Sequence, residues 1–259
     1  MRRINTNAEL AIILGSGMNG VMPGINIKYK ISFNEIERLK QPTVDSHKGE
    51  ITVLEIDSKE VIVVKGRLHY YEGYNERELS ELTKLLFESG VKRLVVANAS
   101  GGVNKNLEEG DLLLIKDQIN FRFKTPLRGL GKNNKNIQFP DMSKAYCEDM
   151  SQIAIKVASA QNIKLKKGVY LGLTGPSLET IAEYKMAIVL GADCIGMSTV
   201  PEVIMAKYLG MRCLGLSVVS NVFNEDNIKE TSFEAVIETV EIANKKLSLL
   251  LSSLINEFA

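Results

Sequence analysis

The chain has 259 residues, with 32 Lys and Arg against 31 Asp and Glu, three cysteines, two histidines and no tryptophan. Hydrophobic residues make up 45% and charged residues 24%, an ordinary globular composition that excludes a disordered or fibrous protein. A net charge of +1 provides no general field for nucleic acid or an anionic membrane, so any bound anion needs a local site. Two histidines cannot form a His-rich metal site, and we expect no metal.

The cysteines and the N-terminus predict a cytoplasmic protein. Cys147, Cys194 and Cys213 form no CxxC pair, and an odd, widely spaced set is typical of a reducing compartment. We expect them to be small buried hydrophobic residues. The apolar run at 10–14 is too short for a signal-peptide core of about 7–15 residues. No stretch approaches the ~18 apolar residues of a membrane span.

Short β-branched runs recur along the chain and predict strands. Several are apolar on both faces, as expected for strands in a sheet that is covered on both sides. Residues 57–60 are an expected hairpin turn between two of these strands. The expected strands are 10–14, 51–56, 61–64, 94–97, 112–115, 169–173, 194–197 and 213–219.

Amphipathic helices are expected between these strands. Leucines recur on one face of 76–89, which ends at Gly90. A capping box at 231–234 predicts the start of a final helix that runs to about residue 255. The other expected helices are 143–161, 177–190 with Ser177 at its start, and 203–209 with Pro201 near its first position.

Strands alternate with helices to the last helix, which predicts one α/β domain over residues 1–259, without a linker or an internal repeat. The stretch 116–141 is polar and irregular. A loop of that length in a compact domain is usually a lid, a subunit contact or a disordered segment.

Residues 15–20 read GSGMNG, follow a predicted strand and match the G-x-G-x-x-G pattern of dinucleotide sites. Pro23 and Gly24 interrupt the helix that should follow, and no acidic residue ends a second strand. We therefore expect a glycine-rich turn whose N–H groups and Ser16 hydroxyl can face an anion.

Four further segments of unusual composition follow predicted strands, where α/β folds bind ligands. In GRLHYYEGY at 66–74, Arg67 and His69 are two residues apart and share a face in an extended chain. A guanidinium can bind phosphate with two hydrogen bonds, and an imidazole adds a donor. The alternative is a surface arginine beside a core histidine.

The other three segments read NASGGVN at 98–104, TGPSLET at 174–180 and GMSTVPEV at 196–203. Paired glycines in the first let backbone amides approach a ligand closely. In the second, Glu179 is expected in the first turn of a helix, where the macrodipole favours an ionised carboxylate. Asn221 ends the last predicted strand. Each feature taken alone also fits an ordinary turn or helix cap.

In this order, the segments resemble the trimeric purine nucleoside phosphorylases, the family that includes the methylthioadenosine phosphorylases. The resemblance covers nearly the whole chain. It implies a homotrimer and a phosphorylase/hydrolase-like α/β fold, with a central mixed β-sheet that is partly closed into a barrel and flanked by helices. The matching motifs are LGSG at 14–17, the three segments at 66–74, 98–104 and 175–180, GMSTVPEV at 196–203, SNV at 220–222, LEEGD at 107–111, TPLRG at 125–129 and FPDMSKAY at 139–146.

The resemblance implies cleavage of the N-glycosidic bond of purine nucleosides by inorganic phosphate, giving free base and ribose 1-phosphate in purine salvage. Phosphate is a co-substrate, and no cofactor is implied. The transition state resembles an oxocarbenium ion, with negative charge on the leaving purine. The enzyme must therefore hold a phosphate dianion and stabilise the departing base with pre-positioned groups.

The resemblance also assigns residues. His69, Glu179 and Asn221 are the expected catalytic residues, with Glu72 orienting Arg67 or His69. Glu179 should accept a hydrogen bond from purine N1–H, and Asn221 should reach O6 and N7, which favours inosine, guanosine and their deoxy forms. The expected phosphate site is Ser16, His47, Arg67, His69, Ser100 and Ser198, and the expected nucleoside site is Tyr71, Ala99, Leu178, Glu179, Ile195, Met197, Asn221 and Phe233.

Several positions depart from the family pattern. Leu178 replaces a stacking phenylalanine, Phe233 aligns with the histidine that binds the ribose 5′-OH, and Ser100 replaces the usual alanine. The aromatic residue that a neighbouring subunit normally supplies falls near Lys135. Phe233 leaves open an activity on 5′-modified nucleosides such as methylthioadenosine or methylthioinosine. A non-catalytic nucleoside or phosphate sensor and a hydrolase that uses water are the remaining alternatives.

Overall fold

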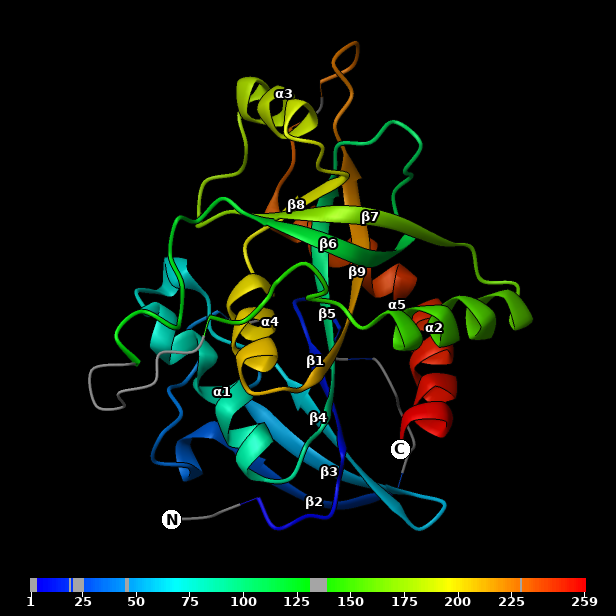
Figure 1. The fold of residues 1–259 in the computed structure, drawn as a ribbon. Helices are drawn as coiled ribbons and strands as arrows, with labels where there is room; N and C mark the ends of the chain where they lie inside the picture. Colours follow the sequence, from blue (N-terminus) through cyan, green and yellow to red (C-terminus); the bar gives the residue numbers. More distant parts are fainter. Residues whose placement is uncertain (1–3, 19, 21–25, 45–46, 131–138, 229) are drawn as a thin grey trace.

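A mixed β-sheet organises the computed structural model, which describes residues 4–18, 20, 26–44, 47–130, 139–228 and 230–259 (Figure 1). Its strands are β1 (Leu10–Leu14), β2 (Ile27–Ser32), β3 (Glu50–Ile56), β4 (Lys59–Lys65), β5 (Arg93–Gly102), β6 (Leu112–Asn120), β7 (Leu165–Gly172), β8 (Cys194–Gly196) and β9 (Arg212–Val222). Within the described residues the strand order is β2-β3-β4-β1-β5-β8-β7-β6-β9.

Strands β5 and β9 also pair with each other, in parallel, so β5, β8, β7, β6 and β9 close into a barrel. The other strands continue from β5 as an open layer in which β1 is parallel to both β4 and β5, while β2 and β3 are antiparallel additions. The predicted fold class, a mixed sheet partly closed into a barrel and flanked by helices, is confirmed.

Helices cover the sheet on both faces (Figure 1). In β1, Ala11 and Ile13 belong to the apolar cluster that includes α1 (Glu76–Glu88) and α4 (Val200–Tyr208). The alternate residues, Leu10, Ile12 and Leu14, belong to the cluster that includes α2 (Glu148–Ala160) and α5 (Phe233–Phe258). Because successive side chains of a strand point to opposite faces, an entirely apolar strand needs helices on both sides. Helix α3 (Ile181–Val189) lies at the barrel end of the molecule.

Local sequence signals set the helix starts and the hairpin. The Asn75 side chain accepts hydrogen bonds from the N–H groups of Arg77 and Glu78 at the start of α1. Helix α5 begins after Ser232, whose hydroxyl accepts from the N–H of Ala235 at 3.2 Å, so the cap lies one residue after the predicted one. The predicted hairpin turn joins β3 to β4 through residues 57–58, both with positive φ.

Two predicted turns or loops are partly strand. Strand β5 continues to Gly102, so residues 98–102 form part of the barrel wall rather than a turn. Strand β6 continues to Asn120 and thereby takes the first part of the predicted loop at 116–141. Pairing of β5 with β9 and of β6 with β7 satisfies the backbone hydrogen bonds of these residues. It thereby outweighs the low strand propensity of their glycines and polar residues. Residues 131–138, with Lys135, lie outside the described residues.

Two predicted helices begin later than expected, α2 at Glu148 and α3 at Ile181. The three cysteines are free, and Cys194 and Cys213 are buried as predicted, whereas Cys147 is partly exposed. In the part of the chain that the structure describes, no helix has both the length and the apolarity to cross a membrane.

Candidate active site

A cavity of about 350 Å³ lies where β5 and β9 meet the loops that follow β1, β4, β7 and β8. The beginning of α5 completes its wall. The structure therefore brings together motifs that are spread from residue 16 to residue 233. The predicted site residues in the wall are Ser16, Arg67, His69, Tyr71, Ala99, Ser100, Leu178, Glu179, Met197, Ser198, Asn221 and Phe233.

Three predicted residues lie behind the wall. His47 is buried, and its Nε2 is 3.0 Å from the Ser16 hydroxyl. Glu72 contacts His69 and so supports the wall indirectly. Ile195 is only 2% exposed and packs in the apolar cluster with Leu171. Its strand, β8, turns that side chain toward the interior rather than toward the cavity.

His69 lines one end of the cavity, and His47 lies behind it. Their rings lie 4.9 Å apart between centroids, and the Tyr71 ring stacks on His69 at 4.8 Å with an interplanar angle of 9°. The carboxylate of Glu72 accepts from His69 Nδ1 at 3.1 Å and from the His69 N–H at 2.7 Å. Glu72 is expected to orient Arg67 or His69, and the structure shows its contact with His69.

Burial sets the charge of this end. Desolvation lowers the pKa of His69, and desolvation together with the neighbouring His69 and Arg67 lowers the pKa of His47 to about 2. Burial raises the pKa of Glu72, but hydrogen bonds from His69 and Thr43 outweigh burial and lower it to about 2. At neutral pH the site therefore combines two neutral imidazoles with one carboxylate. Because Glu72 takes Nδ1–H of His69, Nε2 keeps a lone pair and can receive a proton.

The buried imidazoles predict a pH-dependent stability. Because burial lowers both pKa values below that of a free imidazole, stability is lost as pH falls below about 6.5, and for His47, with a pKa of about 2, the loss is about 1.4 kcal/mol per pH unit. His47→Gln keeps a polar group for Ser16 but removes one titration. We expect it to lower the slope of unfolding free energy against pH between about 6.5 and 5 by about 1.4 kcal/mol per pH unit, measured by urea denaturation without phosphate.

The remaining slope in that variant combines His69, the other histidine of the chain, with Glu179, whose raised pKa acts in the opposite direction. Glu72 does not interfere in this window, since its own contribution is lost only as pH falls from about 4.5 toward 2. An unchanged slope in His47→Gln would mean that His47 is already protonated in the folded protein.

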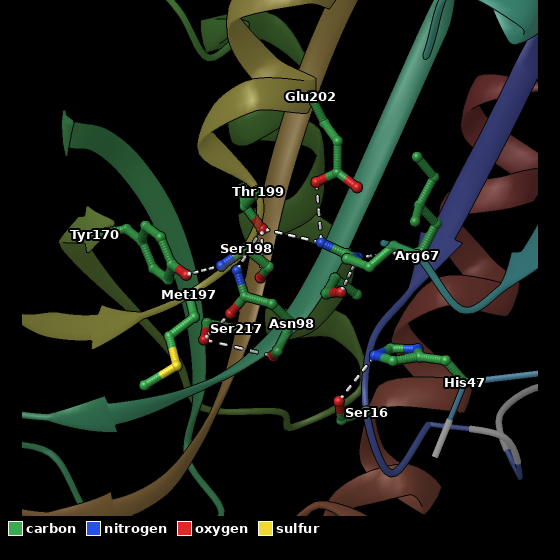
Figure 2. Close-up of polar contacts among 12 residues, drawn as sticks. Ser16, His47, Arg67, Asn98, Tyr170, Met197, Ser198, Thr199, Glu202 and Ser217 are labelled. Atoms are coloured by element: carbon green, nitrogen blue, oxygen red, sulfur yellow. Dashed lines mark hydrogen bonds and ion pairs between the residues drawn. The ribbon is translucent and has the colours of Figure 1, made fainter. Parts of the chain in front are cut away.

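Arg67 lies deep in the wall, with 2% of its surface exposed (Figure 2). Its Nη1 donates to Glu202 at 3.0 Å and to Thr199 at 3.2 Å. Its Nη2 donates to the carbonyls of Ile13 and Ala97 at 3.2 and 2.6 Å. The four terminal N–H groups thus have protein partners, and the buried Nε has none. Arg67 can offer an anion one N–H, rather than the two that the sequence predicted.

Thr199 connects Arg67 to the barrel (Figure 2). It has φ 63° and ψ −48° just before α4, a rarely populated backbone conformation that costs a β-branched residue on the order of 1–3 kcal/mol. Its hydroxyl accepts from Arg67 and, at 2.7 Å, from the Asn98 amide. The Asn98 Oδ1 accepts from Ser217 at 2.6 Å. This network holds the Arg67 guanidinium between β5, β9 and α4.

Ser100 also belongs to this network, since its hydroxyl is 2.6 Å from that of Ser217. Ser100, which stands where the family usually has alanine, is therefore hydrogen-bonded to strand β9. Sequence reasoning missed the roles of Asn98, Thr199 and Glu202. Thr199 and Glu202 are part of the GMSTVPEV motif, but nothing in a sequence pairs Glu202 with an arginine 135 positions away.

Glu179 and Asn221 form the other end of the cavity. Glu179 precedes α3, which is capped by Thr180, so it is not in the first helical turn as predicted. Burial raises the pKa of Glu179, the opposite direction from the predicted macrodipole effect. Asn221 Oδ1 accepts from the Ser220 hydroxyl at 2.9 Å. Tyr184, which the sequence reasoning also missed, lies beside both.

Comparison with known proteins gives the family. Residues 9–256 match the Phosphorylase superfamily. The chain is 36% identical over 253 residues to the purine nucleoside phosphorylase of Rattus norvegicus, covering 95% of this chain and 88% of that protein. It is 37% identical to purine nucleoside phosphorylase 1 of Geobacillus stearothermophilus, over 71% of this chain and 68% of that one. The chain belongs to the purine nucleoside phosphorylase family.

Solved structures agree with this assignment. A purine nucleoside phosphorylase from Schistosoma mansoni in complex with adenosine superposes with a TM-score of 0.89 at 30% identity, covering 98% of this chain and 92% of that one. Isoform 2 from the same organism, in complex with cytosine and ribose-1-phosphate, gives 0.86 at 31% identity over the same shares. As a member of the purine nucleoside phosphorylase family, the chain is an enzyme, a pentosyltransferase, which excludes the non-catalytic alternative.

Proposed function

We propose that this enzyme cleaves 6-oxopurine nucleosides with inorganic phosphate, within purine salvage. Its substrates are inosine, guanosine and their 2′-deoxy forms, and its products are the free base and (deoxy)ribose 1-phosphate. One observation carries the proposal: a single cavity is lined by the His69 imidazole, the Ser16 and Ser198 hydroxyls and Arg67 as well as by Glu179 and Asn221.

The first end suits a phosphate. Ser16 and Ser198 offer hydroxyls, Arg67 offers its buried Nε–H, and His69 and His47 lie close by. A neutral imidazole can accept a hydrogen bond from the O–H of a phosphate monoanion, and the hydroxyls and the Arg67 Nε–H can hold a dianion. A phosphate oxygen then forms the new bond to C1′, while the C1′–N9 electron pair leaves with the purine.

The second end suits the departing purine. The Glu179 carboxylate can accept a hydrogen bond from N1–H, and the Asn221 amide can donate to O6 or N7 as negative charge builds there. Donors that are already in place require no reorganisation during the reaction. A 6-amino group would meet a donor instead of an acceptor, which supports the preference for 6-oxopurines.

A panel of nucleosides tests the proposal directly. We expect phosphate-dependent release of hypoxanthine from inosine and of guanine from guanosine, with ribose 1-phosphate as co-product. Adenosine and methylthioadenosine should react more slowly, by about tenfold or more for each unmatched buried hydrogen bond. Turnover in phosphate-free buffer would show a hydrolase instead. Dominant turnover of methylthioadenosine would contradict the 6-oxopurine preference.

A second function is favoured by one observation. Phe233 lines the cavity together with Leu178, Val44 and Val236, so this part of the wall is apolar. A phenyl ring cannot donate a hydrogen bond to a 5′-hydroxyl, whereas it can contact a 5′-thioether. Cleavage of 5′-modified nucleosides such as methylthioinosine is therefore the alternative, and adding methylthioinosine to the panel distinguishes it from inosine turnover.

The proposal includes a cytoplasmic homotrimer. Large apolar side chains remain at the surface of the single chain, with Phe139, Val189 and Ile188 exposed by 89%, 85% and 47%. Contact between subunits would remove such side chains from water. The free cysteines are in keeping with a reducing compartment.

A further inference from the structure

Tyr184 lies in the first turn of α3, and its ring is fixed from two sides. It stacks on Phe223 with 4.7 Å between centroids and an interplanar angle of 15°. It also packs against the buried cluster that contains Leu171 and Ile195. Tyr184 faces the cavity between Glu179 and Asn221. The packing of the ring therefore determines where the hydroxyl lies.

The Tyr184 side chain lines the cavity together with Glu179 and Asn221, and its hydroxyl interacts with both. A phenol has one proton, and an ionised carboxylate can only accept. In contact with both, Tyr184 would therefore donate to Glu179 and accept from the Asn221 Nδ2–H. An independent contact gives the same orientation of the amide, since Asn221 Oδ1 accepts from Ser220 at 2.9 Å.

We propose that Tyr184 is a positioning residue that orients the Asn221 amide and thereby sets the preference for 6-oxopurines over 6-aminopurines. The inference rests on the proposed function of this cavity. With one Nδ2–H bonded to Tyr184, the second remains for a substrate acceptor such as O6. A reversed amide would instead present Oδ1, which suits a 6-amino donor. Tyr184 thus acts on the purine through Asn221.

The same hydroxyl acts on the charge of Glu179. Burial raises the pKa of Glu179, and the hydrogen bond from Tyr184 works against that rise. Burial and the nearby Glu179 raise the pKa of Tyr184 to about 12, so the phenol stays protonated at the pH of any assay. Removal of the hydroxyl should therefore shift Glu179 further toward its protonated form, which cannot accept from purine N1–H through the same oxygen.

The variant Tyr184→Phe tests the role, because it keeps the ring on Phe223 and removes only the hydroxyl. We expect the ratio of kcat/KM for inosine to that for adenosine to fall by about tenfold, the effect of one hydrogen bond to a polar or charged group. We also expect the acid limb of the kcat/KM profile for inosine to move to higher pH. The melting temperature shows whether the fold is intact.

Two controls separate positioning from packing. Tyr29→Phe removes a hydroxyl that donates to the Asn5 carbonyl at 2.6 Å in β2, away from the cavity, and should leave both readouts unchanged. Phe223→Leu weakens the support of the ring but leaves the Tyr184 hydroxyl in place. It should lower stability more than it lowers the inosine-to-adenosine ratio.

The outcomes separate this inference from the proposed function. Suppose that the wild-type enzyme cleaves inosine and that Tyr184→Phe changes neither the inosine-to-adenosine ratio of kcat/KM nor the acid limb of the inosine pH profile. The role of Tyr184 is then overturned, and the proposed function stands. If the wild-type enzyme shows no phosphate-dependent cleavage, the proposed function fails. Calorimetric binding of hypoxanthine and adenine then tests Tyr184: a reduced preference for hypoxanthine in Tyr184→Phe supports the inference, and an equal preference overturns it.

Discussion

Arg67→Ala is expected to lower kcat/KM for phosphate by about 10²–10³, the usual effect of removing one pre-positioned donor from a developing charge. The loss should arise mainly from a higher KM for phosphate. Binding of hypoxanthine should be largely retained, since Glu179 and Asn221 form the other end of the cavity. Initial rates at varied phosphate concentration, together with calorimetric binding of hypoxanthine, measure the two effects separately.

The same substitution should destabilise the protein. It leaves the carboxylate of Glu202, which is 4% exposed, without its ion-pair partner, and breaking a buried pair costs about 3–5 kcal/mol. Arg38→Ala is the matched control, because Arg38 pairs with Glu81 and Glu88 at the surface, where such pairs contribute about 0–1 kcal/mol.

A second variant separates phosphate binding from stability. Glu202→Gln removes the charge that faces Arg67 but keeps the Nε–H donor and a hydrogen-bond acceptor. We expect it to lower the free energy of unfolding while raising the KM for phosphate less than Arg67→Ala does. Unchanged phosphate kinetics in Arg67→Ala would show that Arg67 serves only the internal network and that the phosphate lies elsewhere.

Asn221→Asp is expected to reduce the preference for inosine over adenosine by about 10² or more, the effect of losing a donor at a site of developing charge. A carboxylate at position 221 would repel O6 and accept from a 6-amino group. It would also share the Tyr184 hydroxyl with Glu179, and two close carboxylates raise the pKa of one of them. Steady-state kinetics with both nucleosides at saturating phosphate measure the ratio.

The control for this substitution is Asn224→Asp, which makes the same chemical change at an exposed position outside the main cavity. It should leave the ratio unchanged. Tyr184→Phe combined with Asn221→Asp should change the ratio by less than the sum of the two single effects, because both act through one amide. An unaltered inosine-to-adenosine ratio in Asn221→Asp would remove the specificity argument.

The sequence predicts most of the fold because the local signals agree with the packing. The apolar runs, the leucine face of α1 and the hairpin at 57–58 each place an element correctly. Strands run beyond their predicted ends where pairing with a strand distant in sequence determines their length. Strand β5 continues through residues 98–102 because β9 lies beside it, and no local pattern indicates that neighbour.

The sequence predicts which residues line the cavity better than it predicts how each of them acts. Arg67 and His69 share the cavity as their spacing indicates. The number of N–H groups that Arg67 can offer depends on Glu202 and Thr199, which only the folded chain brings near. Likewise the charge of Glu179 follows from burial rather than from a helix end. Composition and residue spacing carry no information on the free N–H groups of Arg67 or on the charge of Glu179.

Strand β5 has a further consequence for how the enzyme moves. It pairs with β1, β8 and β9 and also supplies Ala99 and Ser100 to the cavity. Its amides are therefore expected to exchange with deuterium only when the entire domain unfolds. The opposite wall, residues 176–179 with 231–233, consists of loops and a helix start. Ligand entry is therefore expected to involve a sub-global opening of that wall, while β5 and its cavity residues stay as rigid as the core.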